Sequence, residues 1–260
     1  MQRQPPRSRI RNVALIDSGA LRPWRPTMTS GLQWWFAADH ISGVAAGGAV
    51  SAWNDSSGNA YNLAQGTGSL QPTWQTNIIN GKPIVRFDGS DYLPTASSFT
   101  INDTLSVIVV YASAIATRTV LIGQENTANA FHLQVDVLGS GNSQGGFGAI
   151  IPGVFVCNAQ GARRTTGTFT IFCYTRNGAG ATHAVYENGL PLTLNNNNTN
   201  SYSADGTKGL GRRGSGSESF NGDLAELMLW NVVISAETLR KAHLYLARKY
   251  GLLNAANLQY

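Results

Sequence analysis

The side chains able to do acid–base chemistry are few in this sequence, and their spacing does not pair them. The 260 residues include 14 acids. Two carboxylates on one face of a strand, as a glycosidase needs, require a spacing of i, i+2 or i, i+4. The closest acids are three residues apart, Asp88 with Asp91 and Asp223 with Glu226. At that spacing they would face opposite sides of a continuous strand, so the sequence predicts no local catalytic dyad and favours a protein that is not an enzyme.

Metal ligands are equally sparse. The sequence has four histidines, and no two of them have the i, i+4 spacing with which a helix presents two ligands. No cofactor is therefore expected. Asp88 and Asp91 are weak candidates for calcium, but they stand beside Ser and Gly in FDGSDYL, where a carboxylate accepts backbone N–H groups in a turn. The turn is the favoured interpretation, and calcium stays open as the alternative.

Polar and aromatic side chains offer a candidate site for a sugar. From residue 131 to 137, apolar residues alternate with polar ones, which predicts a strand with one face on a core and the other in solvent. Sugar sites combine aromatic faces with fixed hydrogen-bonding groups. The candidates are the outward row His132, Gln134 and Asp136, Tyr174 and Arg176 on a neighbouring strand, and the rim residues Trp74 and Tyr92. An ordinary solvated sheet face would show the same alternation.

Short strands separated by Gly, Asn, Ser and Asp turns must position these side chains, and this pattern is typical of a sandwich or jelly roll. Strands are expected at residues 32–37, 50–53, 83–87, 104–112, 119–123, 131–137, 169–176, 182–187 and 223–230. The stretch 104–112 is apolar on both faces, which predicts a central strand covered on two sides. One helix is expected near the C-terminus, with Ser235 as its N-cap and Gly251 after its last turn.

The positive charge is concentrated at the N-terminal end. The formal net charge is +5, and residues 1–27 account for all of it with six arginines and one acid. The arginines are Arg3, Arg7, Arg9, Arg11, Arg22 and Arg25. We expect residues 1–27 to be an extended anchoring arm, 28–253 a sandwich domain and 254–260 a tail. The neutral remainder argues against nucleic-acid binding except through the arm.

No stretch predicts membrane insertion or a cleaved secretion signal. The longest apolar stretch, Val107–Ala112, is far below the roughly 20 residues of a spanning helix. Near the start, Val13–Ile16 is shorter than the roughly 7 to 15 apolar residues of a signal peptide. Reduced thiols are therefore expected for Cys157 and Cys173, although the two could pair if their segments formed a hairpin.

Several stretches, taken in order, resemble a known family. They are LQWWFAAD from Leu32, VSAWNDSSGNAYNLAQ from Val50, PIVRFDGSDYL from Pro83, GTFTIFCYTRNGAGATHAVYENGLPL from Gly167 and LGRRGSGSESFNGDLAELMLW from Leu210. They are similar to the concanavalin A-like lectin/glucanase superfamily, and in particular to the laminin-G and pentraxin-like domains of phage virion and bacterial surface proteins. The resemblance implies an all-β fold, a two-sheet antiparallel jelly-roll sandwich with one C-terminal helix. For many members it implies glycan binding, sometimes with calcium; the acidic strand motif of the glucanase branch is absent.

A glycan-binding fold without a secretion signal fits a phage virion, whose proteins fold in the host cytoplasm. We therefore expect an accessory capsid (decoration) or tail component, oligomeric within the particle. Residues 1–27 would contact other virion proteins, and the sandwich would contact a cell-surface glycan. A stand-alone carbohydrate-binding protein is the alternative, and a polysaccharide hydrolase with carboxylates from distant strands is the least favoured.

Overall fold

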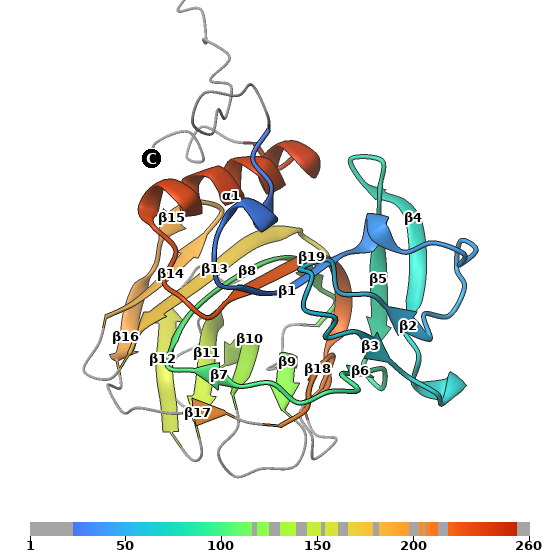
Figure 1. The fold of residues 1–260 in the computed structure, drawn as a ribbon, viewed down its shortest axis with the longest axis horizontal. Helices are drawn as coiled ribbons and strands as arrows, with labels where there is room; N and C mark the ends of the chain where they lie inside the picture. Colours follow the sequence, from blue (N-terminus) through green and yellow to red (C-terminus); the bar gives the residue numbers. More distant parts are fainter. Residues whose placement is uncertain are drawn as a thin grey trace, which may run out of the picture.

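Two antiparallel β-sheets packed face to face form the body of the protein (Figure 1). The computed structural model describes residues 23–115, 119–124, 131–138, 145–151, 154–160, 166–178, 182–197, 203–204, 206–212 and 218–253. With its one α-helix near the C-terminus, the architecture confirms the predicted all-β jelly-roll sandwich. Of the predicted arm, residues 1–22 lie outside the described part.

The first sheet has eight strands. Its hydrogen-bonded order is β15 (Leu190–Pro191), β14 (His183–Glu187), β13 (Thr170–Asn177), β8 (Thr104–Ser113), β19 (Asn221–Trp230), β5 (Lys82–Asp88) and β4 (Thr73–Ile79). The eighth strand, β1 (Leu32–Ala37), pairs with the second half of β19, next to β5 along the same strand.

The second sheet has seven strands. Its order is β16 (Thr193–Asn197), β12 (Val154–Gln160), β11 (Gly145–Ile151), β10 (His132–Leu138), β9 (Thr119–Gln124), β18 (Lys208–Leu210) and β6 (Leu93–Pro94). The remaining elements are the pairs β17 (Ser203–Ala204) with β7 (Ile101–Asn102) and β2 (Ala52–Trp53) with β3 (Leu63–Ala64), and the short 3-10 helices η1 (Pro26–Met28), η2 (Ala38–His40) and η3 (Gly68–Leu70).

The main core lies between the two sheets. It takes inward side chains from both, such as Val107 and Val109 of β8 and Leu121 and Leu133 of the second sheet. Trp53 lies here with 1% of its surface exposed. The inward faces of the strands therefore follow the alternation that the sequence predicts.

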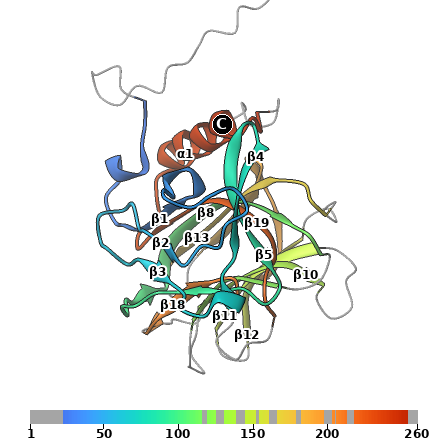
Figure 2. The same ribbon diagram turned by 90° about the vertical axis from the view of Figure 1, so that its right-hand side faces the viewer.

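A second core covers the outer face of the first sheet. Helix α1 (Ala236–Lys249) lies over this face (Figures 1 and 2), and its buried residues pack on Ile108 and Val110 of β8. The central strand β8 is thus buried on both faces, as predicted. Trp24 also belongs to this core and is 3% exposed. The described end of the predicted arm therefore packs on the sandwich.

Helix α1 begins and ends where its capping residues predict. The Ser235 side chain accepts a hydrogen bond from the Thr238 N–H, and Gly251 follows the helix with φ +67°. The β4–β5 turn adds a contact at the far end, because Asn80 Nδ2 donates to the Lys249 carbonyl at 3.1 Å. Within the described residues no helix has both the length and the apolar character that a membrane crossing needs.

A β-bulge in β19 changes the direction of its side chains. The register with β8 shifts between Leu224 and Glu226, and Ala225 and Glu226 both point to the outer layer that contains α1. Asp223 faces the same side, because it pairs with Arg86. The prediction that Asp223 and Glu226 face opposite sides is wrong, since the extra residue of a bulge reverses the alternation beyond it.

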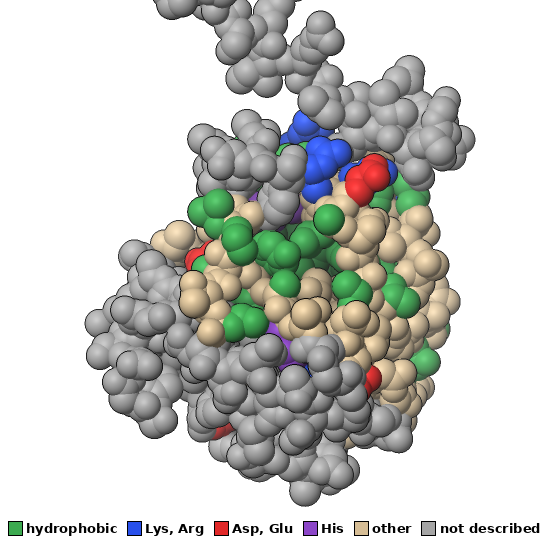
Figure 3. All heavy atoms as spheres, turned by 90° about the vertical axis from the view of Figure 1, so that its left-hand side faces the viewer, with side chains coloured by type: hydrophobic (Ala, Val, Ile, Leu, Met, Phe, Trp, Pro, Cys, Tyr) green, Lys and Arg blue, Asp and Glu red, His purple; other side chains and the backbone are tan. Residues whose placement is uncertain are grey.

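Charged side chains are sparse on the described part of one face of the molecule. On the face in Figure 3, hydrophobic side chains and the tan atoms of the backbone and of other uncharged side chains cover most of the described area, and Lys and Arg side chains gather at its top, at the height of α1. Cys173 is buried and free in β13 of the first sheet. Cys157 lies in β12 of the second sheet, so the segments of the two cysteines do not form a hairpin.

Candidate functional site

His132 and Gln134, two residues of the predicted outward row on β10, do not face solvent. Phe131 and Leu133 lie in the main core as expected, but His132 is only 2% exposed and Gln134 is fully buried. Gln134 Nε2 donates to Glu218 Oε2 at 3.1 Å, from the segment that leads into β19. The exposure predicted for His132 and Gln134 is wrong. Alternation identifies the face of a strand that packs on the core, but it does not show whether other elements cover the opposite face. The Asp136 side chain lies outside the described part.

Tyr174 and Arg176 lie in β13 of the first sheet, so they are not on a strand next to β10. Both are buried, and His183 joins them: its Nδ1 lies 2.9 Å from Tyr174 OH and its Nε2 lies 3.0 Å from Arg176 Nη1. Because a guanidinium only donates, Nε2 must accept and the imidazole is neutral. These residues form a polar cluster inside the sandwich, and the prediction of an exposed sugar-binding pair is wrong.

The two predicted rim residues do not form one site. Trp74 packs half-buried against the main core, and its Nε1 donates to the Ala38 carbonyl at 2.9 Å. Tyr92 is covered by the guanidinium of Arg212, which lies 3.2 Å from the ring centroid. The described residues show no ring contact between Trp74 and Tyr92.

The calcium candidates form a hydrogen-bonded turn. Asp88 Oδ1 accepts from the N–H and the hydroxyl of Ser90, both at 2.7 Å, and Asp91 Oδ2 accepts from the Asp88 N–H at 2.9 Å. The Ser90 bonds lower the pKa of Asp88, whereas burial raises the pKa of Asp91. Strand β5 ends at Asp88, so the two acids meet in a turn instead of facing opposite sides. In the described part of the chain no three His, Cys, Asp or Glu side chains are grouped to hold a metal ion.

Of the predicted anchoring arginines, only Arg25 lies in the described part of the chain; Arg3, Arg7, Arg9, Arg11 and Arg22 lie outside it. Arg25 is exposed and precedes η1, where the Met28 N–H donates to the Arg25 carbonyl at 3.0 Å. Its side chain reaches a depression on the body itself.

This outer depression has a volume of about 410 Å³ and lies beside α1, over the outer face of the first sheet. Four separate segments line it: the residues before η1, the stretch from β1 to η2, the start of β5 and the last part of α1. The lining residues are Pro23, Trp24, Arg25, Trp35, Asp39, His40, Lys82, Tyr245 and Lys249.

Glu226 lies fully buried beneath the outer depression, and its hydrogen bonds connect β1 with α1. One carboxylate oxygen accepts from Trp35 Nε1 at 2.7 Å and Tyr245 OH at 3.1 Å. The other accepts from Lys249 Nζ at 2.8 Å and Tyr250 OH at 2.9 Å. The bulge at Ala225 is what aims this side chain at α1. A carboxylate with four donors holds β1 and the helix in a fixed relation.

Lys249 extends the network to the surface. Its Nζ also donates to Asp39 Oδ1 at 2.7 Å, and Lys82 Nζ lies 3.6 Å from Asp39 Oδ2. Burial acts to raise the pKa of Asp39, but the hydrogen bond and charge of Lys249, with the charges of His40 and Lys82, outweigh it and hold this pKa below its ordinary value. Asp39 therefore stays ionised at neutral pH.

Aromatic rings form the walls of the outer depression. The Trp24 and Tyr245 rings meet edge to face with centroids 5.8 Å apart, and His40 meets the Trp35 ring at 4.9 Å. Burial raises the pKa of Tyr245, helped by the charge of Glu226, so its phenol remains a donor to that carboxylate. Rings beside fixed polar groups suit a ring-shaped polar ligand.

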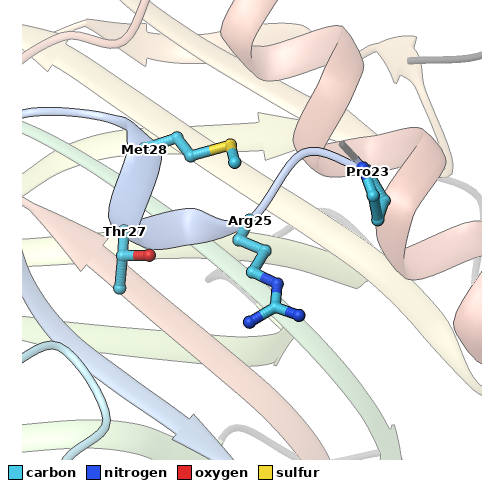
Figure 4. Close-up of a pocket in the computed structure, with 4 residues that line it drawn as sticks. All are labelled: Pro23, Arg25, Thr27 and Met28. Carbon is cyan, nitrogen blue, oxygen red and sulfur yellow. The ribbon is translucent and has the colours of Figure 1, made fainter. Parts of the chain in front are cut away.

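A second depression of about 460 Å³ adjoins the outer depression and shares two of its residues. It is lined by Pro23, Arg25, Thr27 and Met28. In Figure 4 the side chains of Arg25, just before η1, and Met28, its last residue, point in different directions. Arg25 thus lines both depressions.

Sequence reasoning missed the outer depression because its residues come from segments more than 200 positions apart. Two local signals were present. The doublet Trp34–Trp35 places one ring on each face of β1, and Tyr245 and Lys249 are one helical turn apart on α1.

Comparisons with known proteins agree with this architecture. Residues 87–240, more than half of the chain, match a laminin-G domain model described as the concanavalin A-like lectin/glucanases superfamily. No curated protein sequence matches the chain.

Similar solved structures include carbohydrate-active proteins. Domain 4 of AbnA, a GH43 extracellular arabinanase from Geobacillus stearothermophilus in complex with arabinotriose, has 14% identity and a TM-score of 0.53, over 82% of this chain and 97% of that one. A GH54 α-L-arabinofuranosidase has 10% identity and a TM-score of 0.58, over 78% and 51%. A Trypanosoma rangeli sialidase has 13% identity and a TM-score of 0.52, over 83% and 33%. These likenesses concern the fold, and together with the matching family model they place the chain in the concanavalin A-like lectin/glucanase superfamily.

Proposed function

We propose that this chain is a non-enzymatic carbohydrate-binding domain and that the outer depression binds the sugar. The observation that carries the proposal is the juxtaposition, over one face of the sandwich, of the rings of Trp24, Trp35 and Tyr245 with the fixed charges of Asp39 and Lys249. A sugar presents C–H faces to rings and hydroxyl groups to such charges. The similar AbnA domain, which was solved with arabinotriose, supports a sugar as the ligand class.

The carboxylates near the outer depression support binding in preference to hydrolysis. A glycosidase needs one free carboxylate and one carboxylic acid beside the bond that breaks. Glu226 is enclosed and already accepts four hydrogen bonds, and Asp39 is ionised and held by Lys249. Both oxygens of Glu226 are occupied by donors, and Asp39, being ionised, carries no proton to give to a leaving group.

We further propose that the protein is an accessory capsid or tail component of a phage virion. The six arginines of residues 1–27 support this part of the proposal, since a guanidinium forms bidentate pairs with carboxylates on neighbouring virion proteins. In this role the chain is oligomeric within the particle, and the sandwich displays its sugar site outward.

A glycan array with the full chain tests the binding function. We expect selective binding, and loss of about fivefold or more in affinity for His40→Ala, because this exposed ring packs on Trp35 at the edge of the depression. Met28→Ala is the matched control, an exposed residue that lines only the neighbouring depression. Absence of glycan binding refutes the proposal. Release of reducing ends from a bound polysaccharide would establish a hydrolase instead.

Particle assembly tests the virion role. Replacing Arg3, Arg7, Arg9 and Arg11 by Ala is expected to abolish incorporation into particles while the melting temperature is unchanged. Replacing the same four residues by Lys, which keeps the charge, is the control. Normal incorporation of the Ala variant would contradict anchoring through the arm and favour a stand-alone carbohydrate-binding protein.

A further inference from the structure

Cations outnumber acids around the outer depression. Arg25, Lys82 and Lys249 line it, and Asp39 is the one acid in its lining. With the Glu226 carboxylate beneath, three positive charges face two negative ones when His40 is neutral. The excess positive charge lies on Arg25 and Lys82. Lys249 is shared by both carboxylates, whereas these two cations lie nearer the solvent.

Arg25 is the cation whose charge is least neutralised by neighbouring carboxylates. It is exposed, and within the described part of the chain its guanidinium forms no ion pair. Its backbone is nevertheless fixed, since the neighbouring Trp24 is buried in the second core and Pro26 begins η1. A guanidinium on a fixed backbone loses little freedom when it binds an anion, and it offers a planar fork of donors.

Lys82 is the second available cation. Its side chain is 40% exposed, and its Nζ lies 3.6 Å from Asp39 Oδ2, which is longer than a charge-assisted hydrogen bond. Asp39 makes its short contact, 2.7 Å, with Lys249. Lys82 therefore keeps donors free for a ligand in the depression.

We infer that the outer depression takes an anionic sugar, one that carries a carboxylate, sulfate or phosphate group, and that Arg25 and Lys82 bind this group. The inference rests on the proposed function and narrows its ligand class. The exposed His40 ring and those parts of Trp24, Trp35 and Tyr245 that line the depression contact the sugar ring, and the two cations contact its anionic substituent. Because Arg25 and Trp24 precede η1, the chain segment that leads into the sandwich supplies one wall of the site.

The experiment compares pairs of oligosaccharides that share a backbone and differ in charge. The pairs are oligogalacturonate with its methyl ester, a sulfated galactan oligosaccharide with its desulfated form, and a phosphorylated mannan oligosaccharide with its dephosphorylated form. Binding is measured by calorimetry with the full chain. The Arg3, Arg7, Arg9 and Arg11 to Ala variant is measured alongside, so that attraction to the basic arm is subtracted.

We expect the anionic member of at least one pair to bind about tenfold or more tightly, a factor that corresponds to about 1.4 kcal/mol. The pair that shows the preference identifies the anionic group. Arg25→Ala and Lys82→Ala should each remove most of it, and high salt should weaken it. Arg86→Ala is the matched control: Arg86 lies on β5, on the same face as Lys82, outside the lining. Unchanged melting temperatures show that the variants fold.

Three results overturn the inference. If charged and neutral members bind equally, the sugar site stands but its proposed preference is wrong. If the preference persists when Arg25 and Lys82 are both replaced, the anion is bound elsewhere. If no member of any pair, and no glycan on the array, binds, the proposed function fails together with the inference.

Discussion

Glu226→Ala is the change that most directly tests the network beneath the outer depression. The carboxylate is fully buried and accepts from Trp35, Tyr245, Tyr250 and Lys249. Removing it leaves these donors without their acceptor and leaves Lys249 with Asp39 as its remaining short contact to a carboxylate. The helix and β1 would lose the group that joins them.

The expected loss of stability follows from the burial of the pair. Removing one partner of a buried ion pair costs about 3–5 kcal/mol. Asp39 still compensates Lys249 in part, but the Trp35, Tyr245 and Tyr250 donors also lose their acceptor, so a cost in this range is expected. An unfolding entropy of about 2.1 cal/mol/K per residue gives about 0.5 kcal/mol/K for a chain of this length. The melting temperature should therefore fall by about 6–10 °C. Glu226→Gln should also destabilise the fold, because the amide nitrogen of Gln is itself a donor and would face one of the two pairs of donors that the carboxylate accepts from.

Thermal unfolding followed by circular dichroism or calorimetry measures this effect. Glu237→Ala is the control, because Glu237 is exposed on α1 and forms a surface ion pair with Lys241, one helical turn away. We expect it to melt close to the wild type. A Glu226→Ala variant that melts within about 2 °C of the wild type would refute the reasoning, since it would mean that water replaces the carboxylate at little cost.

Three further predictions concern other parts of the fold. Trp53→Ala should cost about 3–5 kcal/mol in a denaturant titration, because it opens a cavity between the sheets; an unchanged midpoint would contradict its core position. The pKa of Asp39 is lower in the folded state, so its contribution to stability is present above about pH 4 and is lost as the pH falls through the folded value. The difference in melting temperature between the wild type and Asp39→Asn should accordingly shrink from pH 7 to pH 3, and a constant difference would argue against the ion pair. Gly211→Ala should destabilise by about 1–3 kcal/mol, because Gly211 has φ +102° and a Cβ there would lie 2.7 Å from the Phe87 ring; equal melting temperatures would contradict this.

The elements that follow from local signals could be predicted from the sequence. The doubly apolar stretch of β8 indicates a central strand, and Ser235 and Gly251 mark the ends of α1, because caps and periodicity depend on neighbouring residues only. These signals were enough for the fold class.

The site could not be predicted in the same way, because it depends on long-range packing. Gln134 has the alternation of an exposed residue, yet the segment at Glu218 covers it. The bulge at Ala225 places Glu226 on the outer face of the first sheet, whereas a regular strand would place it on the inner face. No local pattern reports which side chains a distant helix or loop will cover, so the outer depression emerges only from the assembled fold.

The burial of Trp24 has a mechanical consequence. Within the described part of the chain, a force applied at Pro23 reaches the sandwich first at this ring, which packs edge to face on Tyr245 of α1. Side-chain packing of this kind yields by peeling one contact at a time, whereas β1 is held to β19 by a ladder of backbone hydrogen bonds. Trp24 would therefore act as a release point under tension, so that a pull on the chain at Pro23 detaches this ring before it strains the sheet.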